Sequence, residues 1–521
     1  MSENVASINS PVETEMPSTA GMTTRVVKGS LWTLLGQIMP LLASFVSTPF
    51  VIRFLGSEGY GVLILVGLIP NYFTFADFGM AMASTKFGSE AYGQGDKKKE
   101  GEVVRTAAFA ALLGLLAVAV PIFIFSDWII TNWFSVSEQY QRSAVIALKI
   151  TSVSFVFTIL SAGVNTPMLA RLRMDLNMMV NTVPKILMGI VTPFVLYLGG
   201  RVVEAVWVAF FASLFIFAGT VYYSGKLLPE LYKPTINRKY VRPMLKFGGG
   251  WLIAMIASTF LSNVEKFFLA RYGSVQALAH YSVAFTFANM ATMFSISMIQ
   301  SLFPAFSQLL ASGKRAEFDS LFSRSIRLSL IWLLPTMMCM FVVAKPFFTF
   351  WAGAEFGLES SPPFYILLLG LFFNILAIVP HSTISSVGRT DVFAKLYWIE
   401  LILYVVTAWW LVNSYQIIGA AMAWSLRAIV DAFFIIWLSK KVAGVSYKFL
   451  NHFVSPVLGV ILLLPPVIFA SFFNNFSFWL VPLVLGSLSL YALLIWKTFI
   501  DGDERKWITS KVENLLRLKN D

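Results

Sequence analysis

The 521-residue sequence is poor in charge and in the residue types that most often carry out chemistry. Charged residues make up 13% of it, whereas an ordinary soluble domain has roughly 25%. The single cysteine excludes an internal disulfide, and the three histidines lie far apart in the sequence. No HExxH, GxSxG, P-loop or CxxC motif is present. We therefore expect a protein that is not an enzyme and has no catalytic centre, metal or cofactor.

Apolar side chains, in contrast, form 57% of the sequence. A helix needs about 20 apolar residues to cross a bilayer core of about 30 Å, and fourteen segments meet this requirement. The sequence thus predicts an all-α polytopic membrane protein with about 14 transmembrane helices. The expected spans are residues 30–52, 61–83, 106–126, 145–168, 177–198, 203–224, 247–270, 277–306, 328–344, 364–387, 392–412, 417–438, 451–473 and 477–496.

The distribution of Lys and Arg predicts how these spans are oriented, because short cytoplasmic loops are enriched in both residues. With the N-terminus inside, 30 of the 39 Lys and Arg residues fall in inside segments and five in outside loops. The net charge of +12 is therefore a topology signal, and we expect no nucleic-acid partner. Both termini are expected to be cytoplasmic. Residues 1–24 are predicted to be a disordered tail, and residues 498–521 an amphipathic helix on the cytoplasmic membrane surface.

The chain also repeats itself, since residues 28–105 share a pattern with residues 246–324. The pairs at an offset of 218 residues are Lys28 and Lys246, Arg53 and Arg271, Asn71 and Asn289, and Gly95 and Gly313. Six spans in each copy give both copies the same orientation, so a pseudo-two-fold axis along the membrane normal should relate them, as in many transporters. We predict a six-helix lobe at residues 25–225, its repeat at 226–441, and two extra helices at 442–497.

Two segments of the first repeat resemble a known family. Residues 53–61 read Arg-Phe-Leu-Gly-Ser-Glu-Gly-Tyr-Gly, and the next span carries Asp77-Phe-Gly79 and ends in Lys86-Phe-Gly-Ser-Glu. A looser match is Gly388-Arg-Thr-Asp391. With the plan of fourteen spans, these segments resemble the polysaccharide transporter family, the Wzx-type oligosaccharide flippases of the multidrug/oligosaccharidyl-lipid/polysaccharide superfamily. From the residues alone, the glycines at 56, 59 and 61 are expected to form a tight outside turn.

The resemblance implies a flippase that moves undecaprenyl-diphosphate-linked oligosaccharide units from the cytoplasmic to the periplasmic leaflet by alternating access. Its product would enter O-antigen, capsule or exopolysaccharide synthesis. The resemblance further implies a bacterial inner membrane location, contact with membrane lipids, and polysaccharide polymerase or export proteins as partners. Two alternatives stay open: a cation-coupled multidrug antiporter of the same superfamily, and a flippase for peptidoglycan lipid precursors.

Cations within the expected spans are the candidate substrate-binding groups. An ionisable side chain is costly in lipid and should face a partner or a watery cavity. A diphosphate needs cations, and Arg binds phosphate with two bonds whereas Lys acts as a point charge. We predict that Lys185, Arg427 and Lys266 are cavity cations. Arg427 and Asp431 share a helical face four residues apart, and simple pairing between the two is the alternative.

The acids in the expected spans are candidate cavity or coupling groups: Asp77, Glu265, Glu400 and Asp431. Buried acids can exchange protons, so coupling to an H⁺ or Na⁺ gradient is a hypothesis that rests on these residues. Repeat symmetry predicts that Glu400 faces Lys185 across the cavity. An acid that only supports helix packing is an equal alternative for Asp77.

Overall fold

The computed structural model describes residues 19–233, 236–389, 391–447, 454–472 and 479–498, in which every regular element is a helix. The first elements are α1 (Thr19–Asn71), η2 (Thr74–Asp77), α2 (Met80–Gly93), α3 (Lys97–Ile124), α4 (Ser126–Trp133), α5 (Glu138–Val164), α6 (Thr166–Ala170), α7 (Met174–Tyr197), α8 (Val202–Leu227), η3 (Pro229–Tyr232) and η4 (Arg238–Tyr240). The others are α9 (Val241–Leu261), α10 (Val264–Tyr272), α11 (Val275–Asn289), α12 (Thr292–Ala311), α13 (Arg315–Ala352), α14 (Ala354–Glu359), α15 (Ser361–Ser386), α16 (Asp391–Val442), α17 (Val454–Phe472) and α18 (Leu480–Thr498). Helix α1 begins at Thr19, so it includes residues 19–24 of the predicted N-terminal tail. The predicted amphipathic segment from residue 499 onward lies outside the described residues.

Nine helices in the described part of the chain are long and apolar enough to cross a membrane. Two of them extend over 43 and 48 residues, at Leu35–Asp77 and Lys395–Val442. Each is about twice the length that one crossing needs. Within them, Gly56 and Gln416 have non-helical backbone angles, so each long element consists of two joined helices. The helices therefore support a multi-pass protein, and the total of fourteen spans stays a prediction.

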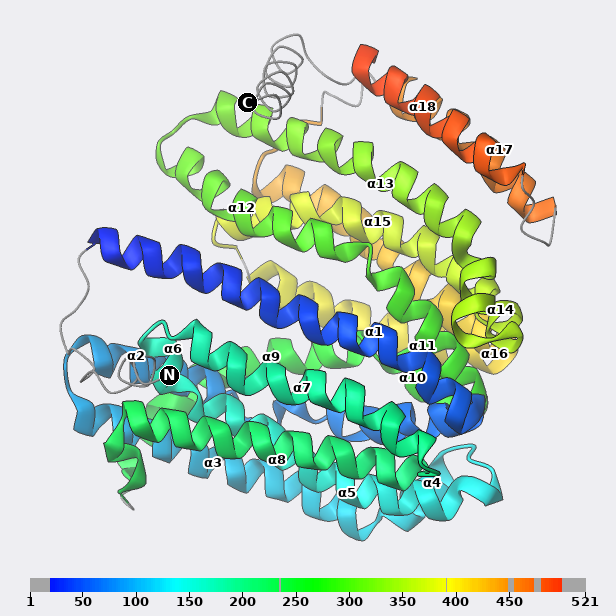
Figure 1. The fold of residues 1–521 in the computed structure, drawn as a ribbon. Coiled ribbons are helices and arrows are strands. Elements are labelled where there is room, and N and C mark those ends of the chain that lie inside the picture. Colours follow the sequence, from blue (N-terminus) through cyan, green and yellow to red (C-terminus); the bar gives the residue numbers. More distant parts are fainter. Residues whose placement is uncertain (1–18, 234–235, 390, 448–453, 473–478, 499–521) are drawn as a thin grey trace, which may run out of the picture.

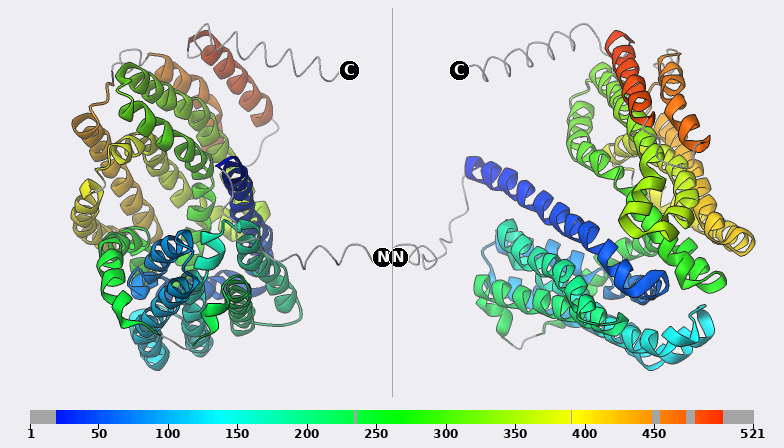
Figure 2. Two further views of the ribbon diagram at one scale, coloured as in Figure 1. Left: turned by 90° about the vertical axis from the view of Figure 1, so that its left-hand side faces the viewer. Right: turned by 45° about the vertical axis from the view of Figure 1, so that its right-hand side comes forward.

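The helices form two lobes (Figures 1 and 2). Helices α1 to α8 build the first lobe, and α10 to α16 build the second. Helix α9 contacts both α2 and α16, and α10 contacts both α11 and α16. Helices α17 and α18 pack on each other at the edge of the second lobe, where both contact α13. The all-helical, two-lobe architecture expected from the sequence is thus observed.

The sequence repeat is also visible in the backbone. Gly95 and Gly313 both have a left-handed φ, of 74° and 70°. Gly199 and Gln416, which are 217 residues apart, have φ values of 95° and 49°. Glycine adopts this conformation readily, whereas other residues pay a steric cost for it. Position 416 keeps the left-handed conformation of position 199 although it is not a glycine. The two lobes therefore follow a similar chain path at these positions, which supports the duplication inferred from the sequence.

The two lobes meet tightly at the end of the molecule that the charge distribution predicts to be outside, where Figure 1 shows α4 and α14. Helix α1 crosses α11 so closely that a Cβ atom on Gly61 would lie 1.9 Å from the carbonyl oxygen of Val275. Nearby, the Ser57 hydroxyl of the first lobe hydrogen bonds to the Glu355 carboxylate of the second. The segment that resembles the family motif is therefore part of a contact between lobes as well as a turn.

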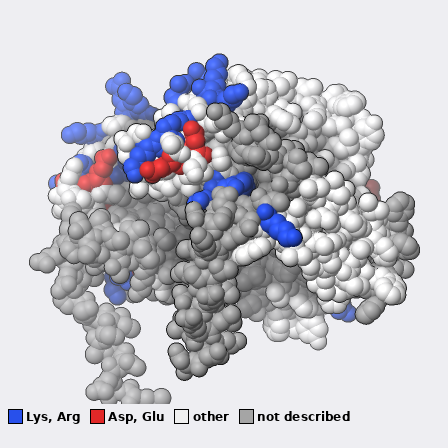
Figure 3. Space-filling model, turned by 90° about the horizontal axis from the view of Figure 1, so that it is seen from above, with Lys and Arg blue, Asp and Glu red and all other residues white. Residues whose placement is uncertain are grey.

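Charge is unevenly distributed over the surface. In the view of Figure 3, Lys and Arg gather toward one end of the molecule, and most of the remaining described surface in this view is uncharged. An uncharged, apolar surface is what a lipid environment requires, because the bilayer core solvates charge poorly.

Candidate functional site

Five of the seven predicted site residues lie in one cluster within the second lobe. Their positions follow from the path of α10 and of the two halves of α16, which join at Gln416. A spacing of four residues places Tyr404 on the same helical face as Glu400, and Asp431 on the same face as Arg427. The five clustered residues are Glu265 and Lys266 of α10, Glu400 of the first half of α16, and Arg427 and Asp431 of the second half.

Glu265 is fully buried and accepts two hydrogen bonds from tyrosine hydroxyls. The Tyr404 hydroxyl donates to one carboxylate oxygen at 2.7 Å, and the Tyr281 hydroxyl donates to the other at 3.2 Å. Complete burial disfavours the charged carboxylate, whereas the nearby cations Lys266 and Arg427 partly offset this cost. Glu265 is thus a buried hydrogen-bond acceptor that joins α10, α11 and α16, and it has no exposed surface with which to meet a substrate.

Lys266 is held by polar and aromatic neighbours. Its Nζ donates to Oδ1 of Asn263 at 3.0 Å and lies 4.3 Å from the ring centroid of Phe285. Asn263 lies in the break between α9 and α10, and its backbone carbonyl accepts a hydrogen bond from the Tyr72 hydroxyl of the first lobe. This cation therefore lies beside a direct link between the lobes.

Arg427 rests on two aromatic rings. Its Cζ lies 5.4 Å from the ring centroid of Tyr404 and 5.9 Å from that of Trp424, distances at which a cation is attracted to a ring face. Its Nε is buried and has no hydrogen-bond partner among the described residues. The carboxylates of Glu400 and Asp431 attract it at longer range, yet no ion pair joins Arg427 to a described acid. The guanidinium therefore keeps donors for a ligand, unlike in the simple Arg427–Asp431 pair considered above.

Glu400 and Asp431 form a pair of buried carboxyl groups that face each other. Neither oxygen of Glu400 receives a hydrogen bond from a described donor, nor does Oδ1 of Asp431. Two ionised carboxylates repel, whereas one shared proton or a bound cation would supply the missing partner. The pair is therefore suited to hold a small cation.

Lys185 lies apart from this cluster. It is exposed on α7 and makes no hydrogen bond or ion pair with a described residue. The charged neighbours of Glu400 are Asp431 and Arg427, both on the other half of its own helix. The pairing of Lys185 with Glu400 that symmetry predicts is not among the contacts of the structure, and the role of Lys185 in a cavity stays a prediction.

The carboxylate of Asp77 binds the backbone at the start of a helix. Its two carboxylate oxygens accept the backbone N–H groups of Gly79 and Ala81, at 2.9 and 3.0 Å, where α2 begins. Phe78 and Gly79 are left-handed at this point, with φ of 53° and 71°, so the helix breaks and restarts here. An acid at a helix start satisfies free N–H groups and interacts well with the helix dipole. These contacts give Asp77 a structural role at the start of α2, and a coupling role for Asp77 stays a prediction.

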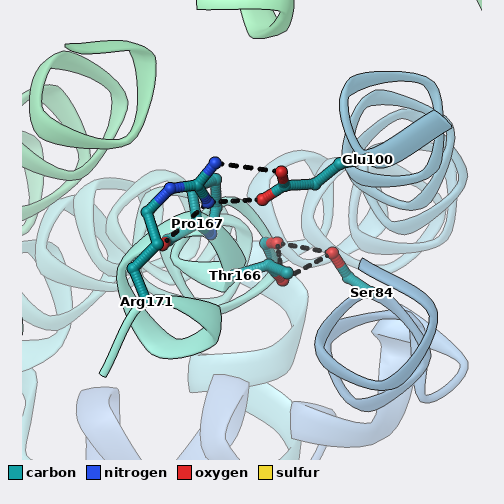
Figure 4. Close-up of polar contacts among 6 residues, drawn as sticks. Ser84, Glu100, Thr166, Pro167 and Arg171 are labelled. Carbon is teal, nitrogen blue, oxygen red and sulfur yellow. Dashed lines mark hydrogen bonds and ion pairs between the residues drawn. The ribbon is translucent and has the colours of Figure 1, made fainter. Parts of the chain in front are cut away.

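One buried ion pair was not anticipated from the sequence. Figure 4 shows the Arg171 side chain reaching to Glu100, with its two terminal nitrogens 2.6 and 3.0 Å from the two carboxylate oxygens. Glu100 is fully buried, and the guanidinium also lies 4.4 Å from the ring centroid of Tyr92. The pair fixes α3 to the turn after α6 at the predicted cytoplasmic end. Both residues occur in segments that read as solvated loops, so no local pattern marks them as partners.

Comparisons with known proteins agree with the fold. A family model described as "Polysaccharide biosynthesis protein" matches residues 26–310, and the MatE model matches residues 251–410. A protein of Shigella flexneri named as an O-antigen transporter is 25% identical over 426 residues, which are 81% of this chain and 99% of that protein. A protein of Haloferax volcanii named as a low-salt glycan biosynthesis flippase is 20% identical over 410 residues, 78% of this chain and 82% of that protein.

Two solved transporters share the architecture. The lipid II flippase MurJ in an inward closed conformation superimposes with a TM-score of 0.70 at 18% identity, over 90% of this chain and 98% of that one. An inward-facing multidrug resistance transporter of the MATE family superimposes with a TM-score of 0.63 at 11% identity, over 79% of this chain and 94% of that one. At these identities the likeness is one of fold.

Proposed function

Because the chain belongs to the polysaccharide biosynthesis protein family, we propose that it is a flippase for a lipid-linked oligosaccharide. The proposed substrate is a sugar unit on undecaprenyl diphosphate, moved from the cytoplasmic to the periplasmic leaflet. The product would serve O-antigen, capsule or exopolysaccharide synthesis. Relatives named as an O-antigen transporter and a glycan biosynthesis flippase support this class of function.

The observation that carries the proposal is that the Arg427 guanidinium is held in place but is not paired with a described acid. A diphosphate is recognised by a guanidinium whose N–H donors are free and whose position is fixed. Arg427 is supported by Tyr404 and Trp424 and has no direct ion pair to a described acid. We propose that it binds the diphosphate, with Lys266 and Lys185 as further cations along the path.

Two lobes of the same orientation support movement by alternating access, in which one lobe rocks against the other. In this structure the lobes are in contact at the predicted outer end, through Gly61 and Val275. Separation of these two residues would open a path to the outer leaflet.

We propose that the carboxyl pair of Glu400 and Asp431 couples this movement to an H⁺ or Na⁺ gradient. The two groups are buried and face each other, and both oxygens of Glu400 and Oδ1 of Asp431 lack a donor among the described residues. A cation held there would also reduce the attraction of both acids for Arg427. Binding of the coupling ion and of the diphosphate would then favour each other.

The proposed location is the bacterial inner membrane, with both termini in the cytoplasm. The excess of Lys and Arg in the predicted inside segments supports this orientation. Surface-polysaccharide polymerase or export proteins are the proposed protein partners, since they would use the flipped unit.

Deletion of the gene tests the function. We expect complete lipid-linked oligosaccharide units to accumulate on the cytoplasmic face and the surface polymer to disappear. Complementation with Arg427→Ala should fail, whereas Lys149→Ala should restore the polymer. Lys149 is a suitable control because it is also a cation in a predicted span, but its Nζ lies over Phe123 in the first lobe.

The same experiment separates the alternatives. Normal lipids and polymer together with sensitivity to cationic dyes would indicate the multidrug antiporter, a function that the acid pair Glu400–Asp431 would also suit. Accumulation of peptidoglycan precursor in place of oligosaccharide would indicate the precursor flippase.

A further inference from the structure

We infer that Tyr404 is a positioning residue that holds Arg427 in place for an anionic head group, with Glu265 as its anchor. This inference rests on the proposed function, because it assumes that Arg427 binds the diphosphate. In this inference neither Glu265 nor Tyr404 touches the substrate, and both act through Arg427.

The first step is the anchor. Glu265 is fully buried, and its hydrogen bond from Tyr404 is the shorter of the two that it receives, at 2.7 Å against 3.2 Å from Tyr281. A hydrogen bond from a hydroxyl group to a carboxyl oxygen at this distance is short and directional. Tyr404 is itself buried. Its hydroxyl, and with it the plane of its ring, is therefore fixed relative to α10.

The second step is the support of the cation. Arg427 lies over two rings, Tyr404 and Trp424. Trp424 is three residues away on the same helix and moves with Arg427. Tyr404 lies on the other half of α16, before the break at Gln416. It is thus the ring that fixes Arg427 relative to the rest of the lobe.

The third step is the reason why Arg427 needs a support: two nearby carboxyl groups compete with a phosphate for its guanidinium. Glu400 and Asp431 both attract Arg427, although neither forms an ion pair with it. Without a fixed ring beneath it, the guanidinium would move toward these carboxylates and its donors would be consumed. The Glu265–Tyr404 bond therefore keeps Arg427 available for a phosphate.

The test measures binding of farnesyl diphosphate, and of farnesol as a probe without phosphate, to the purified full-length protein. Tyr404→Phe keeps the ring and removes the bond to Glu265. We expect it to weaken farnesyl diphosphate binding by up to about tenfold, the scale of one lost buried hydrogen bond, with farnesol binding unchanged. Tyr281→Phe removes the other bond to the same carboxylate, so it is the matched control and should leave both affinities unchanged.

A double-mutant cycle separates positioning from a structural role. In an Arg427→Ala background, Tyr404→Phe should have no further effect on farnesyl diphosphate binding, because there is no cation left to position. Equal losses in Tyr404→Phe and Tyr281→Phe, or additive losses with Arg427→Ala, would overturn the inference while leaving the proposed function intact. If Arg427→Ala alone binds farnesyl diphosphate normally, both the inference and the proposed role of Arg427 are wrong. Thermal unfolding of each variant shows that it is folded.

Discussion

The Cα atom of Gly61 in the first lobe packs against the backbone carbonyl of Val275 in the second, leaving no room for a side chain. Both residues belong to the helices that cross at the predicted outer end, α1 and α11. The contact is between main chains, so neither helix can yield by a change of side-chain rotamer. The lobes can close at this point only because residue 61 is glycine.

Gly61→Ala should therefore hold the lobes apart at this end. We expect the cross-linking yield between Ser57→Cys and Glu355→Cys, measured in a Cys339→Ser background, to fall several-fold. Gly67→Ala in the same helix is the matched control, because a Cβ atom there meets nothing within 4 Å. An unchanged yield in Gly61→Ala would contradict the claim that closure at this end requires glycine at position 61.

Arg171→Ala should strongly destabilise the first lobe, because it leaves the carboxylate of Glu100 buried and unpaired. The expected loss is about 3–5 kcal/mol in the free energy of unfolding. Arg173→Ala removes the exposed pair with Asp175 two residues away, where both side chains are 42% exposed, and should cost less than about 1 kcal/mol. Denaturant unfolding in detergent measures both values, and similar losses would contradict the structural role of the buried pair.

Asp77 variants distinguish a helix cap from a coupling group. Asp77→Asn keeps an oxygen that can accept an N–H of the α2 start, so transport should persist with a small loss of stability. Asp77→Ala removes both acceptors and should cost about 1 kcal/mol. Transport that is abolished in Asp77→Asn at normal stability would instead identify Asp77 as a coupling acid.

The equivalent breaks in the two lobes should respond in opposite directions. Gln416 has φ 49° and ψ −124°, a conformation that favours glycine, so Gln416→Gly should stabilise the protein by about 1 kcal/mol. Gly199→Ala should destabilise it by a similar amount, because φ there is 95° and a residue with a Cβ atom pays a steric cost for this backbone conformation. The added Cβ atom would touch nothing else within 4 Å, so backbone strain is the only expected effect. Thermal unfolding of the two variants checks the signs, and the same sign in both would contradict the strain argument.

Much of the fold could be predicted because a helix in lipid needs a continuous run of apolar residues, which is visible in the local sequence. Runs of apolar residues mark the helices, and a constant offset reveals the two lobes without any contact being known. The break at residues 72–79 is harder to predict, since it depends on Asp77 binding two backbone N–H groups, and the residue itself fits other roles equally well.

The candidate site could be predicted in part for a related reason. Glu265, Arg427 and Asp431 stand out as charges in apolar segments, which lipid penalises. Their partners do not stand out, because Tyr404 lies 139 residues from Glu265 and tyrosine is ordinary in a membrane helix. The expected pairing of Lys185 with Glu400 used symmetry alone, whereas the charged neighbours of Glu400 come from its own helix.

The duplicated chain path has a consequence for how such a protein could arise. A dimer of identical six-helix subunits would carry each charge of the cluster twice, on both sides of its axis. A fused duplicate lets the copies diverge while the backbone breaks are kept. At the offsets of the repeat, the first lobe has Ser47, Phe210 and Leu214 where the second has Glu265, Arg427 and Asp431. Fusion thus allows one half to carry charge at these positions while the other stays uncharged there, an asymmetry that no homodimer can encode.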